Sequence, residues 1–387
     1  MEKPTLKPNN PNFSSGPCAK RPGWKIESLI NANIGRSHRS GEAKEKLKLV
    51  IDKSKELLNL PNDYVVGIMP ASNTGSLEAA LWSLLGLKGV DILAWENFGK
   101  DWVQDVVKQL KLTNINVHDV DYGDFPDVSK VNFENDIIFT WNGTTSGVKV
   151  PNADWIPDDR DGLTICDATS AIFAMPIDYN KCDVITWSWQ KVLGGEAAHG
   201  MIALSPRALS RLESYTPKWP IPKIFRIANN KKVINGIFEG STINTPSMIC
   251  VEDALDGLIW AEKSGGLKFL FETSKASFEK VYNWIEDNDW VTFLSNNQNK
   301  EYLSNTGITF KICDDWYLSK NEDDQRMIVK QICNILSDEN VAYDINGYPK
   351  APPSFRVWAG GTVQPDNIEL LLPWLKYAYY KVKESNA

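Results

Sequence analysis

Short apolar runs alternate with longer amphipathic segments over the first two thirds of the chain. The apolar runs predict strands over residues 63–70, 91–95, 115–120, 136–141, 163–168, 184–189 and 200–205. Helical periodicity with a charged opposite face predicts helices over residues 40–60, 76–86 and 100–112. Strands that alternate with helices in this way indicate an α/β domain with a large, mainly parallel sheet.

The pattern changes near residue 265. Predicted helices at residues 274–288, 321–336 and 368–384 surround strand-like runs at residues 307–312 and 354–360, which is typical of a smaller α+β domain. The first residues are rich in proline and asparagine and predict an extended arm. We therefore expect an arm over residues 1–15, a large domain over residues 16–264 and a small domain over residues 265–387.

Composition narrows the class of protein. A chain of 387 residues with 42% hydrophobic and 24% charged residues suits two globular domains. The net charge of −7, without a basic block, argues against a general nucleic-acid binder. The sequence has no secretory leader pattern, no run of about 18 apolar residues and only scattered cysteines, so we expect a cytoplasmic protein with reduced thiols and no membrane partner.

Two classes of catalytic site are disfavoured by the sequence. Only three histidines occur, so we expect no structural zinc cluster and no histidine-rich catalytic metal. No G-x-S-x-G motif is present, which argues against a serine hydrolase of the usual kind.

Three stretches carry candidate chemistry. ASNTGS, residues 71–76, joins a strand to a helix, where free backbone N–H groups bind an anion or serve only an ordinary N-cap. Asp167 of ICDATS lies at the end of an apolar run and is either a carboxylate that faces a ligand, or an N-cap or a partner in a loop salt bridge. Lys191 of SWQKVLGG follows another run and is either a surface charge or a Schiff-base nucleophile.

Together these stretches match the needs of one cofactor. Pyridoxal phosphate requires an amine for its aldehyde, an acid partner for its pyridine nitrogen and donors for its phosphate. Lys191, Asp167 and the turn at residues 71–76 supply these groups. We also expect Gly194 and Gly195 to allow close approach of backbone to the bound ring.

Six motifs, in this order, resemble the phosphoserine aminotransferases: SSGPCAKRPGW, NIGRSHRSGE, CDATS, SWQKVLGG, INTPS and PPSFRVWAGG. The resemblance covers residues 11–361. It implies a class V, fold-type I pyridoxal-phosphate transferase with a seven-stranded sheet, acting as a homodimer with shared active sites. The implied reaction transfers an amino group between L-glutamate and 3-phosphohydroxypyruvate in serine biosynthesis.

The resemblance also implies roles for individual residues. Lys191 would bind the cofactor aldehyde and move the substrate α-proton, and Asp167 would pair with the pyridine nitrogen. The phosphate would be held by Ser72, Asn73, Thr74 and Gln190, together with Asn244 and Thr245 of the neighbouring subunit. Thr144 would lie near the ring hydroxyl, and Phe98 would stack on the ring, with Trp102 as the competing choice.

Two anionic substrate groups require two cationic contacts. Arg356 matches the family arginine that binds the substrate carboxylate, and His38 and Arg39 match the pair that reaches the substrate phosphate across the dimer. Many relatives also have an arginine in a glycine-rich turn where this chain has ASNTG, and a histidine shortly before the carboxylate-binding arginine. This chain has NGYPKAPPSF there, with Lys350 as a candidate replacing charge.

Three other interpretations remain open from the sequence. Serine– or alanine–glyoxylate-type aminotransferases share the class, but SHR and NTP argue against them. A cysteine desulfurase-like lyase needs a persulfide-forming cysteine on a mobile loop, whereas Cys313 lies in a strand-like run and Cys333 in a helical one. A non-enzymatic binding module is disfavoured by the intact Lys191 and Asp167.

Overall fold

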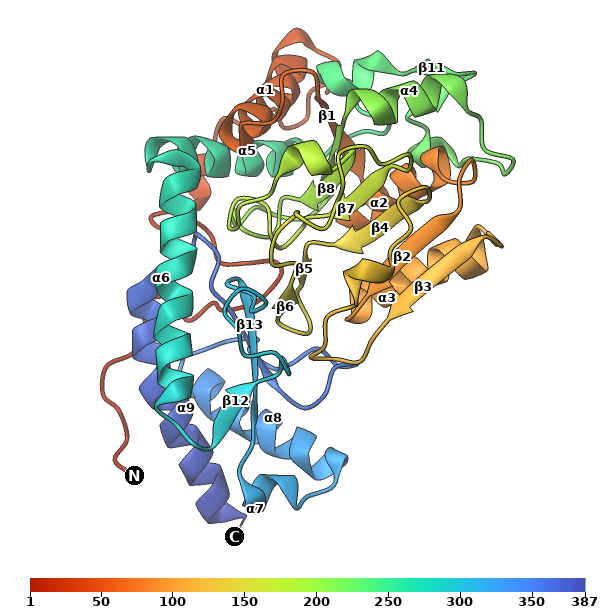
Figure 1. Ribbon diagram of the computed structural model, residues 1–387. Coiled ribbons are helices and arrows are strands. Elements are labelled where there is room, and N and C mark those ends of the chain that lie inside the picture. The colour runs from red at the N-terminus through yellow and green to blue at the C-terminus, as the bar shows by residue number, and fades with distance from the viewer. Residues whose placement is uncertain (387) are drawn as a thin grey trace.

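The structure is a computed structural model that describes residues 1–386. Its largest element is a seven-stranded sheet in the order β1-β9-β8-β7-β4-β2-β3 (Figure 1). Only β9 runs antiparallel to its neighbours, so the expected mainly parallel sheet is confirmed. The strands are β1 (Val65–Pro70), β2 (Val90–Ala94), β3 (Ile115–Asp119), β4 (Asp136–Thr140), β7 (Thr164–Asp167), β8 (Val184–Ser188) and β9 (His199–Leu204).

The central strands are apolar on both faces because the sheet is buried on both faces. Along β8, Val184 belongs to one apolar core, while Ile185 and Trp187 belong to the other. Side chains alternate across a strand, so a continuous apolar run supplies both cores at once. The edge strand β3 is the exception, with most of its side chains at least partly exposed.

Helices cover the two faces of this sheet. Helices α1 (Gly41–Leu58) and α5 (Met248–Lys263) pack on each other and contribute to one core. The other face is covered by α2 (Ser72–Leu84), α3 (Asn97–Gln104) and α4 (Pro206–Ser214). The sequence pattern predicts α1 well but does not predict α4 or α5.

Two predicted helix starts are wrong by several residues. The helix expected from residue 100 begins at Asn97, because the Glu96 side chain accepts the backbone N–H of Gly99 and caps it. It continues into a π-helical segment, η2 (Asp105–Gln109). The ASNTG segment is not a separate turn, since α2 already begins at Ser72.

The C-terminal part contains a second, antiparallel sheet in the order β12-β13-β14. Helices α6 and α9 pack lengthwise beside it, and α8 packs on α9 (Figure 1). Its elements are α6 (Gly266–Glu286), β12 (Val291–Phe293), β13 (Gly307–Ile312), α7 (Asp315–Leu318), α8 (Glu322–Asp338), β14 (Phe355–Trp358) and α9 (Pro365–Ser385). Two small hairpins complete the strands, β5 (Asn142–Gly143) with β6 (Val148–Lys149), and β10 (Ala228–Asn229) with β11 (Lys232–Val233).

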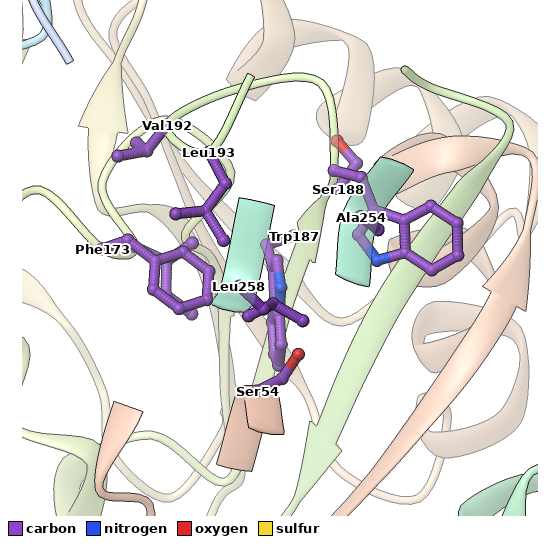
Figure 2. A pocket seen from close by; sticks show the side chains of 10 residues that line it. Ser54, Phe173, Trp187, Ser188, Val192, Leu193, Ala254 and Leu258 are labelled. Atoms are coloured by element: carbon purple, nitrogen blue, oxygen red, sulfur yellow. The ribbon is translucent and has the colours of Figure 1, made fainter. Parts of the chain in front are cut away.

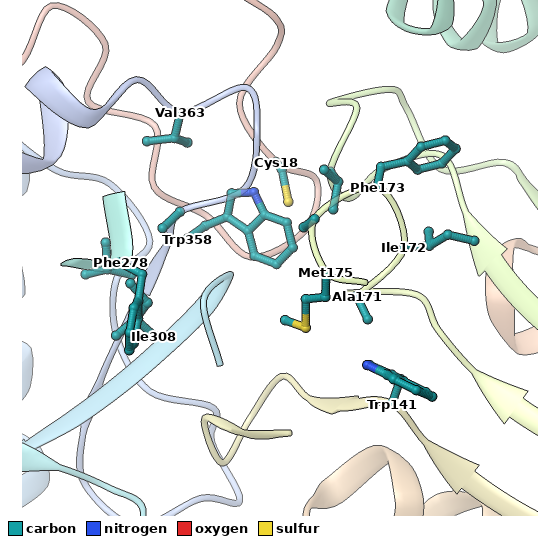
Figure 3. Close-up of a cluster of buried hydrophobic side chains, with 14 of the residues drawn as sticks. Cys18, Trp141, Ala171, Ile172, Phe173, Met175, Phe278, Ile308, Trp358 and Val363 are labelled. Carbon is teal, nitrogen blue, oxygen red and sulfur yellow. The ribbon is translucent and has the colours of Figure 1, made fainter. Parts of the chain in front are cut away.

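The two sheets share one apolar cluster at their junction. Figure 3 shows Trp358 and Phe278 of the C-terminal part beside Met175 and Trp141 of the first part. All four side chains are at most about one twentieth exposed. This continuous packing fixes β14 close to the large sheet, while the exact boundary between two domains at residue 264 stays a prediction. Among residues 1–386, no helix is long and apolar enough to cross a membrane.

Candidate active site

A cavity of about 200 Å³ opens at the carboxyl ends of the parallel strands. This edge is where open α/β sheets bind ligands, because the loops that follow the strands converge there. The segments after β1, β2, β4, β7 and β8 all reach it. Its lining residues are Gly16, Ser72, Asn73, Thr74, Glu96, Phe98, Trp102, Thr140, Asn142, Thr144, Asp167, Thr169, Ser170, Gln190 and Lys191.

Asp167 is the buried carboxylate of the cavity. Its Oδ1 accepts hydrogen bonds from the backbone N–H of Thr169 at 3.0 Å and from the Thr169 hydroxyl at 2.6 Å. Its Oδ2 accepts the indole N–H of Trp102 at 3.2 Å. Burial raises the pKa of Asp167, and these donors and the charge of Lys191 oppose that rise. A positively charged N–H group beside Asp167 therefore stabilises the ionised form of this buried carboxylate.

Lys191 faces the same cavity and is not a surface charge. Its side chain is half-buried, its Nζ donates to the Ser15 carbonyl and lies 5.8 Å from the Trp358 ring centroid. Burial lowers the pKa of Lys191 and the neighbouring Arg356 lowers it further, which increases the neutral, nucleophilic fraction. A Cβ on Gly16 would lie 2.8 Å from Nζ, so the N-terminal segment closes over the amine.

The residues around Lys191 pack as core. Figure 2 shows Trp187, Val192 and Leu193 against Ala254 and Leu258 of α5, around a void of about 10 Å³. This packing against α5 supports the loop that carries Lys191. The tryptophan in β8 is therefore structural, as its place in an apolar run suggests.

Gly194 does not face a cofactor ring, so that expectation is wrong. Its φ is +66°, and a Cβ there would lie 2.2 Å from the Ala19 carbonyl oxygen. A glycine is required because the chain's own N-terminal segment crosses the loop at this point. The backbone N–H of Cys18 donates to the Gln190 carbonyl at 2.9 Å in the same crossing.

The first turn of α2 forms the other end of the cavity. Ser72, Asn73 and Thr74 form the N-terminus of α2, which has no side-chain cap among the described residues, and N–H groups at such a helix start favour an anion. The side-chain oxygens of Asn73 and Gln190 are buried and have no hydrogen-bond partner among residues 1–386. Rotation of either amide turns its NH₂ group into a donor at the same place. The set therefore fits a phosphate.

Phe98 and Trp102 both line the cavity from α3, one helical turn apart. Trp102 is engaged by its hydrogen bond to Asp167. Phe98 has no polar atom and packs 5.7 Å from the Tyr348 ring. The stacking of Phe98 on a bound ring remains a prediction, but the two aromatic residues have different contacts.

Six lining residues were not predicted: Gly16, Glu96, Thr140, Asn142, Thr169 and Ser170. Thr144 donates to the Ser170 hydroxyl at 2.6 Å, and Asn142 donates to it at 2.9 Å. Thr169 and Ser170 are the last two letters of CDATS, so their proximity to Asp167 was the available signal. Glu96 is fully buried, accepts hydrogen bonds from Gly99 and Thr145, and has a pKa that burial raises to about 7.

Arg356 approaches from β14 in the C-terminal part. The side chain is half-buried, its Nε has no hydrogen-bond partner among residues 1–386, and no ion pair involves it there. Its guanidinium lies 5.7 Å from the Tyr348 ring centroid. Burial lowers the pKa of Arg356, as expected for a cation without an anionic partner. Such a group is suited to a carboxylate ligand.

The remaining predicted residues do not line this cavity in one chain. His38 is half-buried and Arg39 exposed in the turn before α1, while Asn244 and Thr245 are exposed before α5. The INTPS loop is anchored where the backbone N–H of Ser247 donates to Nε2 of His199 at 3.0 Å. The resemblance assigns these residues to the neighbouring subunit's site, and that assignment stays a prediction.

Comparisons with known proteins decide the family. A phosphoserine aminotransferase of Methanosarcina barkeri is 54% identical over 98% of this chain and 100% of its own length. This chain is a member of the phosphoserine aminotransferase family. The corresponding protein of Methanosarcina mazei is 53% identical over the same shares of both chains. No protein-family model matches the chain.

Solved structures agree on the fold. A phosphoserine aminotransferase from Cytophaga hutchinsonii covers 95% of this chain and 99% of its own, with a TM-score of 0.79 at 20% identity. A pyridoxal-phosphate-bound phosphoserine aminotransferase from Trichomonas vaginalis covers 95% and 100%, with a TM-score of 0.74 at 19% identity. As a member of this family, the chain is an aminotransferase that depends on pyridoxal 5′-phosphate, and its cavity holds groups that fit each end of that cofactor.

Proposed function

We propose that the protein transfers an amino group from L-glutamate to 3-phosphohydroxypyruvate, giving 2-oxoglutarate and O-phospho-L-serine in serine biosynthesis. The observation that carries this proposal is the arrangement of Lys191 and Asp167 in one cavity beside the unpaired Arg356. Relatives identical at more than half of all positions are phosphoserine aminotransferases, which supports the same substrates here.

Each of these residues has a distinct task. Pyridoxal phosphate supplies a cationic ring that withdraws electrons from the substrate α-carbon when bound. Lys191 Nζ takes the α-proton and returns it, a task that its lowered pKa favours. Asp167 keeps the ring nitrogen protonated, because a buried carboxylate with a raised pKa gains most from a cationic partner. Arg356 holds the α-carboxylate that both substrates share.

The anionic ends of cofactor and substrate require further donors. We assign the cofactor phosphate to Ser72, Asn73, Thr74 and Gln190, and the ring hydroxyl region to Thr144. In a homodimer, Asn244 and Thr245 of the neighbouring subunit complete the phosphate site, and His38 and Arg39 reach the substrate phosphate. The exposure of Arg39, Asn244 and Thr245 in the single chain is consistent with that assembly. We place the enzyme in the cytoplasm on the same proposal.

The lyase interpretation lacks its essential thiol. No cysteine lines the cavity among the described residues. Burial raises the pKa of the thiols of Cys313 and Cys333, so neither is a ready thiolate. Cys18 lies near Lys191 but its thiol is buried, with a pKa raised to about 12.

Absorbance spectroscopy tests the cofactor part of the proposal. The purified protein reconstituted with excess pyridoxal phosphate is expected to show a visible band from the lysine-bound cofactor. Lys191→Ala should lose that band while retaining the circular dichroism of the wild type. A wild type that stays colourless after reconstitution would contradict the assignment.

A further inference from the structure

Tyr348 lies at the tip of a rigid loop between α8 and β14. The backbone N–H of Gly347 donates to the Ser354 carbonyl at 2.8 Å, and that of Ala351 donates to the Tyr348 carbonyl at 2.9 Å. Three prolines in the loop, at positions 349, 352 and 353, restrict its backbone further. The backbone at Tyr348 is therefore restrained by its own loop.

This ring joins the two parts of the molecule at the active site. Its centroid lies 5.7 Å from the guanidinium carbon of Arg356, which belongs to β14. It also lies 5.7 Å from the Phe98 ring, at an interplanar angle of 55°. The Asn97 side-chain NH₂ donates to the Tyr348 hydroxyl at 3.5 Å. Both Phe98 and Asn97 belong to α3, beside the cofactor cavity.

The contact between the Tyr348 ring and Arg356 stabilises the charge of the guanidinium without occupying its N–H donors. The guanidinium is half-buried, and no carboxylate pairs with it among residues 1–386. An aromatic face attracts a cation without accepting its N–H groups in the guanidinium plane. The tyrosine thus stabilises the arginine and leaves those donors free, whereas a protein carboxylate would compete with the substrate.

We propose that Tyr348 is a positioning residue that holds Arg356 ready for the substrate α-carboxylate and keeps Phe98 against the cofactor cavity. The inference rests on the proposed function and deepens it. Glutamate and the keto acid acceptor present the same α-carboxylate to the same arginine. Loss of the ring is therefore expected to weaken the binding of both substrates in parallel, without selecting between them.

Steady-state kinetics of three variants tests this role. Tyr348→Leu and Tyr348→Met are expected to raise the KM of glutamate and of the acceptor by about tenfold each, the size of a desolvated cation–π contact, with kcat within about threefold. Tyr348→Phe keeps the ring and should stay within about twofold of the wild type. Tyr343→Leu is the matched control, because Tyr343 pairs with Asn340 and its ring makes no cation–π contact with Arg356 among the described residues.

A binding measurement gives a second readout that needs no turnover. 2-Oxoglutarate does not react with the pyridoxal form of the enzyme, so calorimetry reports its Kd directly. The Kd should rise about tenfold in Tyr348→Leu and Tyr348→Met, and stay unchanged in Tyr348→Phe and Tyr343→Leu. Thermal unfolding identifies any variant that fails to fold. If either Tyr348→Leu or Tyr348→Met fails, the other variant tests the positioning role.

The outcomes separate this inference from the proposed function. A KM change confined to one substrate, or KM and Kd values within twofold of wild type in both ring-removing variants, would overturn the positioning role. A wild type that does not transaminate glutamate would instead contradict the proposed function. In that case the Kd series with 2-oxoglutarate still decides whether Tyr348 positions Arg356.

Discussion

The indole Nε1 of Trp102 donates a hydrogen bond of 3.2 Å to Oδ2 of Asp167. The same carboxylate receives two bonds from Thr169 on its other oxygen, so its plane is fixed by three donors. A carboxylate held in this way is oriented before a ligand arrives, which lowers the cost of binding.

Trp102→Phe is expected to weaken cofactor binding. The substitution keeps an aromatic ring, although a smaller one, and removes the donor; a hydrogen bond to a charged group is worth about 1.5–3 kcal/mol. We expect the Kd for pyridoxal phosphate to rise at least about tenfold. Trp24→Phe is the matched control, because Trp24 donates a similar bond of 3.1 Å to Asp253 of α5, which is not among the lining residues of the cavity. Equal affinities in both variants would show that the bond to Asp167 is not used.

Asp167→Asn is expected to remove most of the activity. The amide cannot carry the charge that keeps the ring nitrogen protonated, and loss of a buried charge pair costs about 3–5 kcal/mol. We expect kcat to fall at least about 100-fold, with Lys191 still able to bind the aldehyde. Rapid-scan spectroscopy of the glutamate half-reaction measures this step separately. A half-reaction rate within tenfold of the wild type would be incompatible with the role given to Asp167.

Gly194→Ala tests the crossing of the N-terminal segment over the lysine loop. Gly23 has nearly the same backbone φ, +71° against +66°, but a Cβ there meets no atom within 4 Å. Both substitutions incur the strain of positive φ, of about 1 kcal/mol, but only Gly194→Ala also collides with the Ala19 carbonyl. We expect the melting temperature to fall much further in Gly194→Ala, together with loss of the cofactor band. Similar melting temperatures would refute this crossing.

Glu96 makes stability depend on pH. Burial raises its pKa from an ordinary value of 4.5 to about 7, so the folded chain retains a proton that the unfolded chain loses between these values. This contribution to the free energy of unfolding therefore falls as pH rises from 4.5 to about 7, by up to about 3 kcal/mol.

Glu96→Gln should remove that part of the pH dependence. Denaturant unfolding at pH 5 and pH 8 measures it: the variant should gain stability relative to the wild type at the higher pH. Glu45→Gln, at an exposed position of α1, serves as the control and should leave the pH dependence unchanged. A Glu96→Gln slope parallel to that of the wild type would contradict a neutral Glu96 at low pH.

The sequence predicts the large sheet well because its strands are apolar on both faces, which leaves a strong local signal. It also selects Lys191, Asp167 and the ASNTG segment, which lie at or shortly after strand ends and share one cavity in the structure. Helix α3 was placed three residues late because its cap, Glu96, is set by tertiary burial. The hydrogen bond from Trp102 to Asp167 could not be predicted, because 65 residues separate the two. Tyr348 and Arg356 are close in sequence, but their contact depends on how the loop between them folds back.

The same limit explains the error at Gly194. Glycine after a catalytic lysine suggests room for a ligand, but the space is taken by residues 18–20 of the same chain. No local pattern shows which segment crosses a loop.

The acceptor preference tests the central claim most directly. With glutamate as donor, kcat/KM is measured for 3-phosphohydroxypyruvate, pyruvate and glyoxylate on the same cofactor-loaded preparation. A phosphate bound by cationic groups is worth several kcal/mol, so we expect the phosphorylated acceptor to be preferred by about 100-fold or more. A preference for glyoxylate, or equal values for 3-phosphohydroxypyruvate and pyruvate, would contradict the proposed function.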